Sequence, residues 1–217
     1  MKQQVEKTYD AQSNAYDKAH SSCTASEITA VEEIVVKSLL RRIEFKDVLD
    51  AGTGTGRYAV FLAKQGKRVE ATDQSSKMLE VARGKSEELG LSIAFRKEDV
   101  SNISAKDESF DLVMCMLTLA HVEDLNQPFK EFVRVLRPGG HIIISDIHPD
   151  IQKTWGPGLM IDIEGSQFPF PAFHGSVEEY VNAAEKAGAE IIAAIDVPMQ
   201  QKRGLYPGPF VMLARKG

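Results

Sequence analysis

The stretch Val48-Leu49-Asp50-Ala51-Gly52-Thr53-Gly54-Thr55-Gly56-Arg57-Tyr58 decides the fold, because three alternating glycines join a short apolar run to a helical pattern. Glycine tolerates a positive φ and lets a ligand approach the backbone, and the N-terminus of the helix that follows offers free N–H groups. Glycines also build turns that bind nothing, so the turn alone is only a candidate ligand site. It departs from the dinucleotide fingerprint Gly-x-Gly-x-x-Gly, whose third glycine would fall at Arg57.

Strand and helix patterns alternate outward from this turn. Apolar runs predict strands over residues 47–51, 68–72, 92–96, 110–115 and 141–145. Helical patterns lie between them over residues 58–65, 76–89 and 125–136. Alternating units of this length predict an α/β fold with a doubly wound parallel sheet and helices on both of its faces.

The C-terminal part of the chain predicts a reversed last strand. A helical pattern over residues 177–187 stops at Gly188, a good C-terminal cap residue, and the strand pattern 190–197 follows. The final strand pattern, residues 210–214, comes soon after a turn rich in glycine and proline, which leaves no room for a crossover helix. The last two strands are therefore expected to pair antiparallel.

Two segments lie outside this alternation. Residues 1–40 are interpreted as an N-terminal helical cap, since apolar residues recur at spacings of three and four in their second half. Residues 149–175 have few clean periods but contain aromatics such as Trp155 and Phe170. A connection of this length is a lid or binding loop, or else carries small strands of its own. We interpret it as a substrate-side insertion in a single domain of residues 1–217, although its aromatics could also simply cover the sheet.

The composition argues against several kinds of partner. The chain has 217 residues, 43% of them hydrophobic and 26% charged, so it can bury a full-sized core. With a formal charge of −5, the chain lacks the excess of basic side chains that binding to nucleic acid requires. Only Cys23 and Cys115 are present, and the second lies in an apolar strand pattern, which favours a reducing compartment. No stretch approaches the roughly 20 apolar residues of a membrane span, so we expect a cytoplasmic protein with no membrane partner.

Acidic residues follow the predicted strands. Asp73 lies directly after the second strand, where a carboxylate can accept both hydroxyls of a ribose or can instead cap the next helix. Asp99 follows the third strand, where it can accept a proton from an adenine amino group or simply end the strand. Ligands in open α/β sheets bind along the edge formed by the carboxyl ends of the strands, so position agrees with chemistry.

Several motifs occur together in a fixed order: Asp50-x-Gly52-x-Gly54-x-Gly56, Asp73, Asp99-Val100, Phe110-Asp111-Leu112-Val113 and Arg134-Val135-Leu136-Arg137-Pro138-Gly139-Gly140. With them the chain resembles the class I S-adenosylmethionine-dependent methyltransferases of the small-molecule type. The resemblance covers residues 45–147 through motifs and the remainder through topology. It implies a Rossmann-like, doubly wound sheet of seven strands with an antiparallel last strand, in three layers α/β/α.

The resemblance also implies S-adenosyl-L-methionine as cofactor and assigns residues to it. The methionine part would lie beside Asp50, Gly52, Thr53, Gly54 and Gly56. The ribose would be held by Asp73 with its neighbour Gln74, and the adenine would lie near Met78, Asp99 and Val100. Met116 and Leu117 would line the other side, and Tyr16 would close over the cofactor. Met78 and Leu117 could equally be plain core, and Tyr16 could anchor the cap through its ring alone.

Methyl transfer from a sulfonium is an in-line displacement with a neutral leaving group, so the protein mainly supplies orientation and desolvation. A hydroxyl acceptor would benefit from a base. His148 is the preferred candidate, because it lies directly beyond the fifth strand; His121 and His174 are the others. The substrate pocket is expected to include His121, Trp155, Phe170 and His174. The histidines lack the spacing of metal ligands, so no metal site is expected.

The leading hypothesis is methyl transfer to a small, partly apolar acceptor. A nicotinamide or flavin oxidoreductase would share the acid after the second strand and the dipole at the glycine turn, but Arg57 and the turn at residues 137–140 argue against it. A non-catalytic protein that keeps the cofactor site is a third class, although no motif position is degraded.

Overall fold

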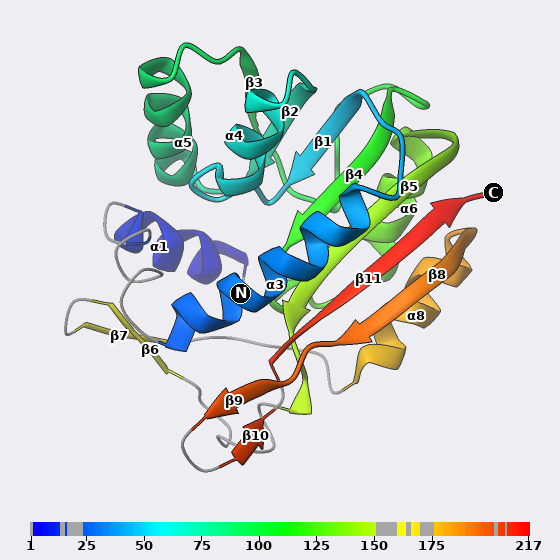
Figure 1. The fold of residues 1–217 in the computed structure, drawn as a ribbon. Helices are drawn as coiled ribbons and strands as arrows, with labels where there is room; N and C mark the ends of the chain where they lie inside the picture. The colour runs from blue at the N-terminus through cyan, green and yellow to red at the C-terminus, as the bar shows by residue number, and fades with distance from the viewer. Residues whose placement is uncertain are drawn as a thin grey trace.

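The computed structural model describes residues 2–13, 16, 24–150, 160–163, 166–169, 176–201, 204–206 and 208–217. Trp155, Phe170 and His174 lie outside these ranges, so the hypotheses about them remain predictions. Figure 1 shows a sheet flanked by helices, with α1 beside the edge toward which the parallel strands point.

A seven-stranded sheet forms the centre of the described chain. Its order is β3-β2-β1-β4-β5-β11-β8. The strands are β1 (Asp47–Ala51), β2 (Arg68–Asp73), β3 (Ile93–Lys97), β4 (Phe110–Met116), β5 (Leu136–Ile147), β8 (Ala189–Asp196) and β11 (Pro209–Lys216). The first five pair parallel, whereas β11 runs antiparallel to both β5 and β8. The Rossmann-like doubly wound sheet with a reversed last strand is therefore confirmed.

Helices cover both faces of this sheet. They are α1 (Lys2–Gln12), α3 (Thr24–Leu40), α4 (Arg57–Lys64), α5 (Ser76–Glu88), α6 (Asn126–Val135) and α8 (Val177–Lys186). One apolar cluster packs α6 and α8 on one face through residues such as Phe132 and Tyr180. The other packs α3 and α4 on the opposite face through Val36 and Leu62. With helices packed on each face through these clusters, the sheet is the middle of three layers, α/β/α.

The two N-terminal helices have different surroundings. Helix α3 packs against β11 and contributes Val36, Leu39 and Leu40 to the core, so it belongs to the layer that covers the sheet. Helix α1 instead contacts α5, at the edge where the parallel strands end (Figure 1). Helix α1 is therefore placed to cover a ligand at that edge.

Two details of the strands differ from the pattern of the sequence. Strand β5 begins at Leu136 rather than at residue 141, because Leu136 already pairs with Phe110 and a register shift follows in β4. Gly139, with φ 76°, lies in this irregular stretch. The described residues also form two small hairpins, one of β6 (Met160–Ile163) and β7 (Ser166–Pro169) and one of β9 (Met199–Gln201) and β10 (Gly204–Tyr206). The second lies where the sequence predicted only a turn.

Candidate functional site

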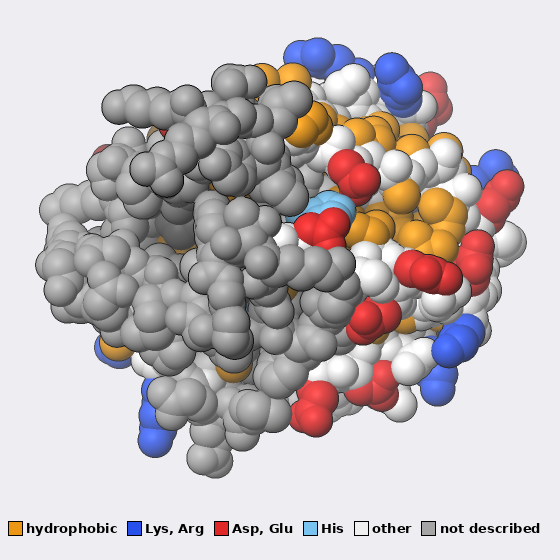
Figure 2. Space-filling model, turned by 90° about the horizontal axis from the view of Figure 1, so that it is seen from below, with side chains coloured by type: hydrophobic (Ala, Val, Ile, Leu, Met, Phe, Trp, Pro, Cys, Tyr) orange, Lys and Arg blue, Asp and Glu red, His pale blue; other side chains and the backbone are white. Residues whose placement is uncertain are grey.

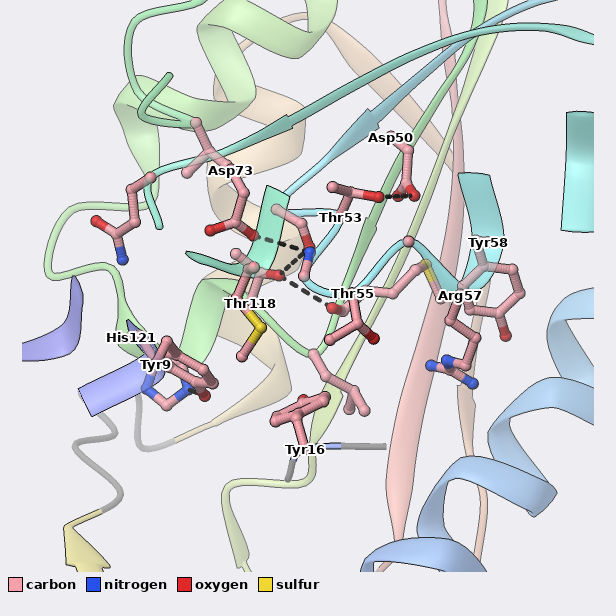
Figure 3. Close-up of a pocket in the computed structure, with 18 of the residues that line it drawn as sticks. Tyr9, Tyr16, Asp50, Thr53, Thr55, Arg57, Tyr58, Asp73, Thr118 and His121 are labelled. Atoms are coloured by element: carbon pink, nitrogen blue, oxygen red, sulfur yellow. Dashed lines mark hydrogen bonds between the residues drawn. The ribbon is translucent and has the colours of Figure 1, made fainter. Parts of the chain in front are cut away.

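A cavity of about 500 Å³ lies at the carboxyl ends of the parallel strands, within the range of small-molecule sites. Its wall contains every residue that the resemblance assigns to the cofactor: Tyr16, Asp50, Gly52, Thr53, Gly54, Gly56, Asp73, Gln74, Met78, Asp99, Val100, Met116 and Leu117. His121 lines it as well. Residues from the glycine turn, from three strand ends and from the N-terminal segment thus meet at one place (Figure 3).

The glycine turn has a geometry that side chains would disturb. Gly52, Gly54 and Gly56 have φ values of 73°, 55° and 83°, which L-residues with a side chain rarely adopt. A Cβ on Gly52 would come within 2.5 Å of the Thr118 side chain, and one on Gly56 within 2.9 Å of the Ala82 Cβ. The backbone N–H groups of Gly52 and Thr53 both donate to the carbonyl of Thr72, at 2.8 and 2.9 Å. The turn is therefore held against β2.

Asp50 places a carboxylate in the cavity wall with almost no access to solvent. Its Oδ2 accepts a hydrogen bond from the Thr53 hydroxyl at 2.6 Å, drawn dashed in Figure 3. Burial raises the pKa of Asp50 to about 6. A carboxylate whose charge is disfavoured by burial is stabilised by a cation beside it, so this wall fits a positively charged ligand.

Asp73 is held in place by backbone donors. Gly54 N–H donates to its Oδ2 and Ser75 N–H to its Oδ1, each at 2.8 Å. The helix cap that Asp73 could have provided is made by Ser75, whose hydroxyl accepts from the Met78 N–H at 3.1 Å. Burial raises the pKa of Asp73. The Gln74 backbone N–H also bears on this carboxylate, which has about four acceptor sites in all, so it can still accept a hydroxyl from a ligand.

The remaining strand ends complete the wall. Asp99 accepts a hydrogen bond from the Ser101 N–H at 2.8 Å. Met78 is buried and also lines the cavity, so core packing and ligand contact do not exclude each other. Leu117 has φ 52°, which is strained for a residue with a side chain, and such strain clusters at functional sites. Its N–H donates to the Ser145 carbonyl at 2.8 Å, which holds the strained turn after β4.

The N-terminal helix closes one side of the cavity. Tyr9 of α1 lines the wall, and its hydroxyl lies 2.6 Å from Nε2 of His121 in η1 (Leu119–His121). Asp10 accepts hydrogen bonds from the Ser75 hydroxyl and from the Lys77 N–H. These contacts tie α1 to the start of α5, next to Asp73.

The structure places His148 away from the described wall of this cavity. Its Nδ1 accepts a hydrogen bond from the Asp150 N–H at 3.1 Å, and its Nε2 lies 3.4 Å from Asp196 Oδ1 on the outer strand β8. Its ring packs edge-on against Phe210. The reason is that the chain turns outward after β5, where the His148 N–H donates to the Gly208 carbonyl. Position directly after a strand therefore did not bring His148 into the wall.

Several residues of the wall have no counterpart in the expectations from sequence. They are Val5, Tyr9, Thr29, Thr55, Arg57, Tyr58, Val60, Lys85, Glu98, Thr118, Val122 and Glu123. Tyr9 lies in the same N-terminal stretch as Tyr16, so the sequence pattern that pointed to Tyr16 could also have pointed to Tyr9. Val5 and Thr29 come from helices whose docking no local pattern reveals. In the described part of the chain, no group of three or more histidine, cysteine or acidic side chains could hold a metal.

Comparison with known proteins also indicates a methyltransferase. A family model described as "Methyltransferase domain" matches residues 49–144. A protein named "Methyltransferase GfsG" from Streptomyces halstedii is 32% identical over 171 residues, which are 77% of this chain and 60% of that protein. The "Ubiquinone biosynthesis O-methyltransferase" of Coxiella burnetii (strain Dugway 5J108-111) is 28% identical over 135 residues, 62% of this chain and 56% of that protein. The chain thus spans less than two thirds of the length of these relatives.

Among solved structures, the fold is shared with an S-adenosylmethionine-dependent methyltransferase from Clostridium acetobutylicum ATCC 824. The TM-score is 0.71 at 20% identity, and the match covers 96% of this chain and 99% of that one. At this level of identity the likeness concerns the fold alone.

Proposed function

We propose that this chain, which belongs to the class I S-adenosylmethionine-dependent methyltransferases, transfers the methyl group of S-adenosyl-L-methionine to a small-molecule acceptor. One observation carries the proposal: a single cavity brings together the glycine turn, the buried Asp50, and the strand-end acids Asp73 and Asp99. An oxidoreductase draws no comparable support from the cavity or from the relatives. A non-catalytic binding protein would share the cavity, but the relatives named as methyltransferases favour the enzyme.

The residues of the wall fit this cofactor. Asp50 would face the cationic methionine part, Asp73 would accept the ribose hydroxyls, and Asp99 would meet the adenine amino group. When bound, the cofactor supplies an electrophilic methyl group on a sulfonium. The chain's own part is to orient that group and to exclude water, and a wall of buried and half-buried residues suits both tasks.

A small acceptor is supported by the size and the charge of the molecule. The cavity of about 500 Å³ is of the size of small-molecule sites, and an entire polymer cannot enter it. On the described part of the face shown in Figure 2, acidic side chains stand among apolar ones and basic side chains lie toward the rim. This distribution, with the formal charge of −5, disfavours nucleic acid as acceptor.

Within the described residues, no helix is long and apolar enough to cross a membrane. Cys115 is a buried free thiol in the middle of β4, and a reducing compartment preserves such a thiol. A cytoplasmic location therefore forms part of the proposal.

Isothermal titration of the purified protein tests the proposed cofactor. S-adenosyl-L-methionine and S-adenosylhomocysteine are expected to bind with micromolar affinity, whereas NAD should give no heat of binding. Binding of NAD, with no binding of these two ligands, would support the oxidoreductase hypothesis instead. Binding of both sulfur ligands with no methyl transfer to any acceptor class would favour the non-catalytic hypothesis.

Replacing Asp73 with alanine is expected to weaken S-adenosylhomocysteine binding by about 10- to 100-fold, or about 1.4–2.7 kcal/mol, because charge-assisted bonds to the ribose are lost. Titration of the variant against wild type gives the number. Asp107→Ala is the matched control, because the Asp107 side chain is 73% exposed and pairs with Arg134 on the surface. Wild-type affinity in a folded Asp73→Ala protein would remove this residue from the ribose site.

The affinity for S-adenosylhomocysteine should fall as the pH drops below about 6. The cofactor's ammonium group needs Asp50 charged, and the pKa of this carboxyl is raised from 3.8 to about 6 by burial. Affinity is therefore expected to decline about tenfold per pH unit below that value. The unliganded protein behaves oppositely: a raised folded pKa contributes stability at low pH that is lost as the pH rises through about 6.

Titrations at several pH values measure how affinity depends on pH. Urea unfolding of the unliganded protein at the same pH values measures how stability depends on pH. In Asp50→Asn the affinity should be weak and should lose the part of the pH dependence that Asp50 contributes, because nothing titrates at that position. Any dependence that remains belongs to other buried acids such as Asp73, whose pKa burial also raises. An unchanged slope in this variant would assign the dependence to another group.

A further inference from the structure

Tyr9 and His121 form a pair in the cavity wall that the proposed cofactor site does not use. The two residues come from α1 and η1, far apart in the sequence, and their side chains meet at 2.6 Å between Tyr9 Oη and His121 Nε2. Their rings are arranged edge-on with centroids 5.4 Å apart. Figure 3 shows the pair on the opposite side of the cavity from Arg57 and Tyr58, with Tyr16 nearby.

The protonation states of the pair follow from its surroundings. Burial, and then the negative charge of neighbouring groups that include Asp146 and Asp73, hold the pKa of Tyr9 well above its ordinary value. Tyr9 is therefore a neutral phenol. When His121 is neutral with its hydrogen on Nδ1, the Tyr9 hydroxyl donates to the unprotonated Nε2. The lone pairs of Tyr9 Oη can in turn accept a hydrogen bond. The wall thus holds a phenol backed by a basic nitrogen.

We propose that Tyr9 and His121 together accept the proton of the methyl acceptor, and that this acceptor is a phenol. The inference rests on the proposed function and names its acceptor class. A phenolic hydroxyl fits because it is acidic enough to pass its proton to an imidazole through one hydrogen-bonded phenol. The rings of Tyr9 and Tyr16, with centroids 6.1 Å apart, and the side chains of Val5 and Val122 supply apolar surface for an aromatic ring.

The proton and the electrons balance along this route. The acceptor oxygen forms a bond to the methyl carbon while the bond from that carbon to sulfur breaks, and its electron pair stays on the sulfur. The proton of the acceptor hydroxyl moves to Tyr9 Oη as the proton of Tyr9 moves to His121 Nε2. A neutral ether, a neutral thioether, a neutral tyrosine and an imidazolium result. The single positive charge has passed from the sulfonium to His121, so the net charge of the cavity is unchanged.

The turn that carries His121 is built to hold that charge. The buried carboxylate of Asp146 accepts a hydrogen bond from the Ala120 N–H at 2.5 Å, directly before His121. The His121 N–H itself donates to the Thr118 carbonyl at 3.1 Å. Titratable groups that bear on the pair are Tyr16, Asp146 and Asp73, and Glu123 also lines the cavity. Burial raises the pKa of Asp146 to about 7, so its carboxyl is charged above that pH. A charged carboxylate near the imidazole stabilises the imidazolium that the route forms.

A chromophoric phenol tests the proposal without knowledge of the natural acceptor. The protein is first saturated with S-adenosylhomocysteine, and the titration of this ligand reports whether the proposed cofactor site exists. 4-Nitrophenol is then added at about pH 7.5, where an ordinary imidazole is neutral, and the absorbance of its phenolate gives the ionised fraction of the bound probe. In the wild type, the ratio of phenolate to phenol should be at least about tenfold higher for bound than for free probe, which is one pKa unit.

Three variants separate the pair from its surroundings. His121→Gln keeps a polar group within reach of Tyr9 but cannot accept a proton at this pH, and Tyr9→Phe removes the hydroxyl that joins the acceptor to the imidazole. Both should return the bound probe to the ratio of the free probe. Asp107→Ala changes an exposed side chain outside the cavity wall and should keep the tenfold increase.

Each contrary result is distinct. Failure of S-adenosylhomocysteine to bind overturns the proposed function, and the inference falls with it. Normal binding of that ligand with no binding of 4-nitrophenol overturns the phenol as acceptor class. Probe that binds without increased ionisation, or with an increase that survives in both His121→Gln and Tyr9→Phe, overturns the pair as proton acceptor.

Discussion

Replacing Gly52 with valine is expected to lower the affinity for S-adenosyl-L-methionine by at least about 100-fold, or about 2.7 kcal/mol. Gly52 has φ 73°, where a residue with a side chain costs about 1–2 kcal/mol, and a β-branched residue costs more. Its Cβ would also lie 2.5 Å from the Thr118 side chain. Because both residues line the cavity, relief of the clash must move the wall that would face the cofactor.

Isothermal titration measures this loss, with circular dichroism to confirm that the variant is folded. Gly66→Val is the matched control: Gly66 has φ 76°, a Cβ at this position would meet no atom within 4 Å, and the residue has no place in the cavity wall. It should lose stability through backbone strain but keep its affinity. Gly52→Val/Thr118→Ala should recover part of the binding. Affinity within about threefold of wild type in the single Gly52→Val protein, a difference below about 0.7 kcal/mol, would contradict the role of the turn.

Glu32→Ala is expected to lower the free energy of unfolding by about 2–4 kcal/mol. Glu32 of α3 is fully buried, and it receives hydrogen bonds from Arg57 Nη2 at 2.6 Å and from the hydroxyl groups of Tyr58 and Ser145. Removing it leaves the Arg57 charge and two hydroxyls without this acceptor. The loss is placed below that of a fully buried ion pair, because the Arg57 side chain is 35% exposed and can reach water.

Urea unfolding of the variant gives the change, and the neighbouring Glu33→Ala is the control. Glu33 is 39% exposed and pairs with Lys37 one helical turn away, an interaction worth about 0.3–0.5 kcal/mol. Equal stabilities of the two variants would mean that Glu32 does not anchor α3. Because Arg57 and Tyr58 line the cavity, Glu32→Ala should also reduce cofactor affinity, whereas Glu33→Ala should not.

Local patterns were sufficient for the parallel core of the sheet. The run from Val48 to Tyr58 contains the end of a buried strand, a glycine turn and the start of a helix. In the structure the strand ends at Ala51 and the helix begins at Arg57, as the pattern predicts. Asp73 could be placed at the cofactor edge because the carboxyl ends of parallel strands necessarily meet at one edge. The competing role as a helix cap could not be decided, because Ser75 lies two residues on and is an equally good cap.

Local patterns failed where the chain leaves the sheet. His148 follows β5 just as Asp73 ends β2, yet its backbone pairs with Gly208 and its ring faces β8 and β11. The reversed strand β11 pairs with β5 up to Ile147, the residue before His148. The local sequence around His148 does not predict this pairing. His121, in contrast, stays in the wall, because the turn after β4 is held by Asp146 and by the Ser145 carbonyl.

The sequence by itself determined the doubly wound sheet, its reversed last strand, the glycine turn and a set of residues, proposed for the cofactor, that line one cavity, because period, turn chemistry and motif order are properties of neighbours along the chain. Only the tertiary structure decided that Tyr9 meets His121, that Glu32 is buried against Arg57, and that His148 lies outside the wall. These contacts join residues far apart in the chain. Their geometry depends on how helices α1 and α3 dock on the finished sheet, which local propensity does not encode.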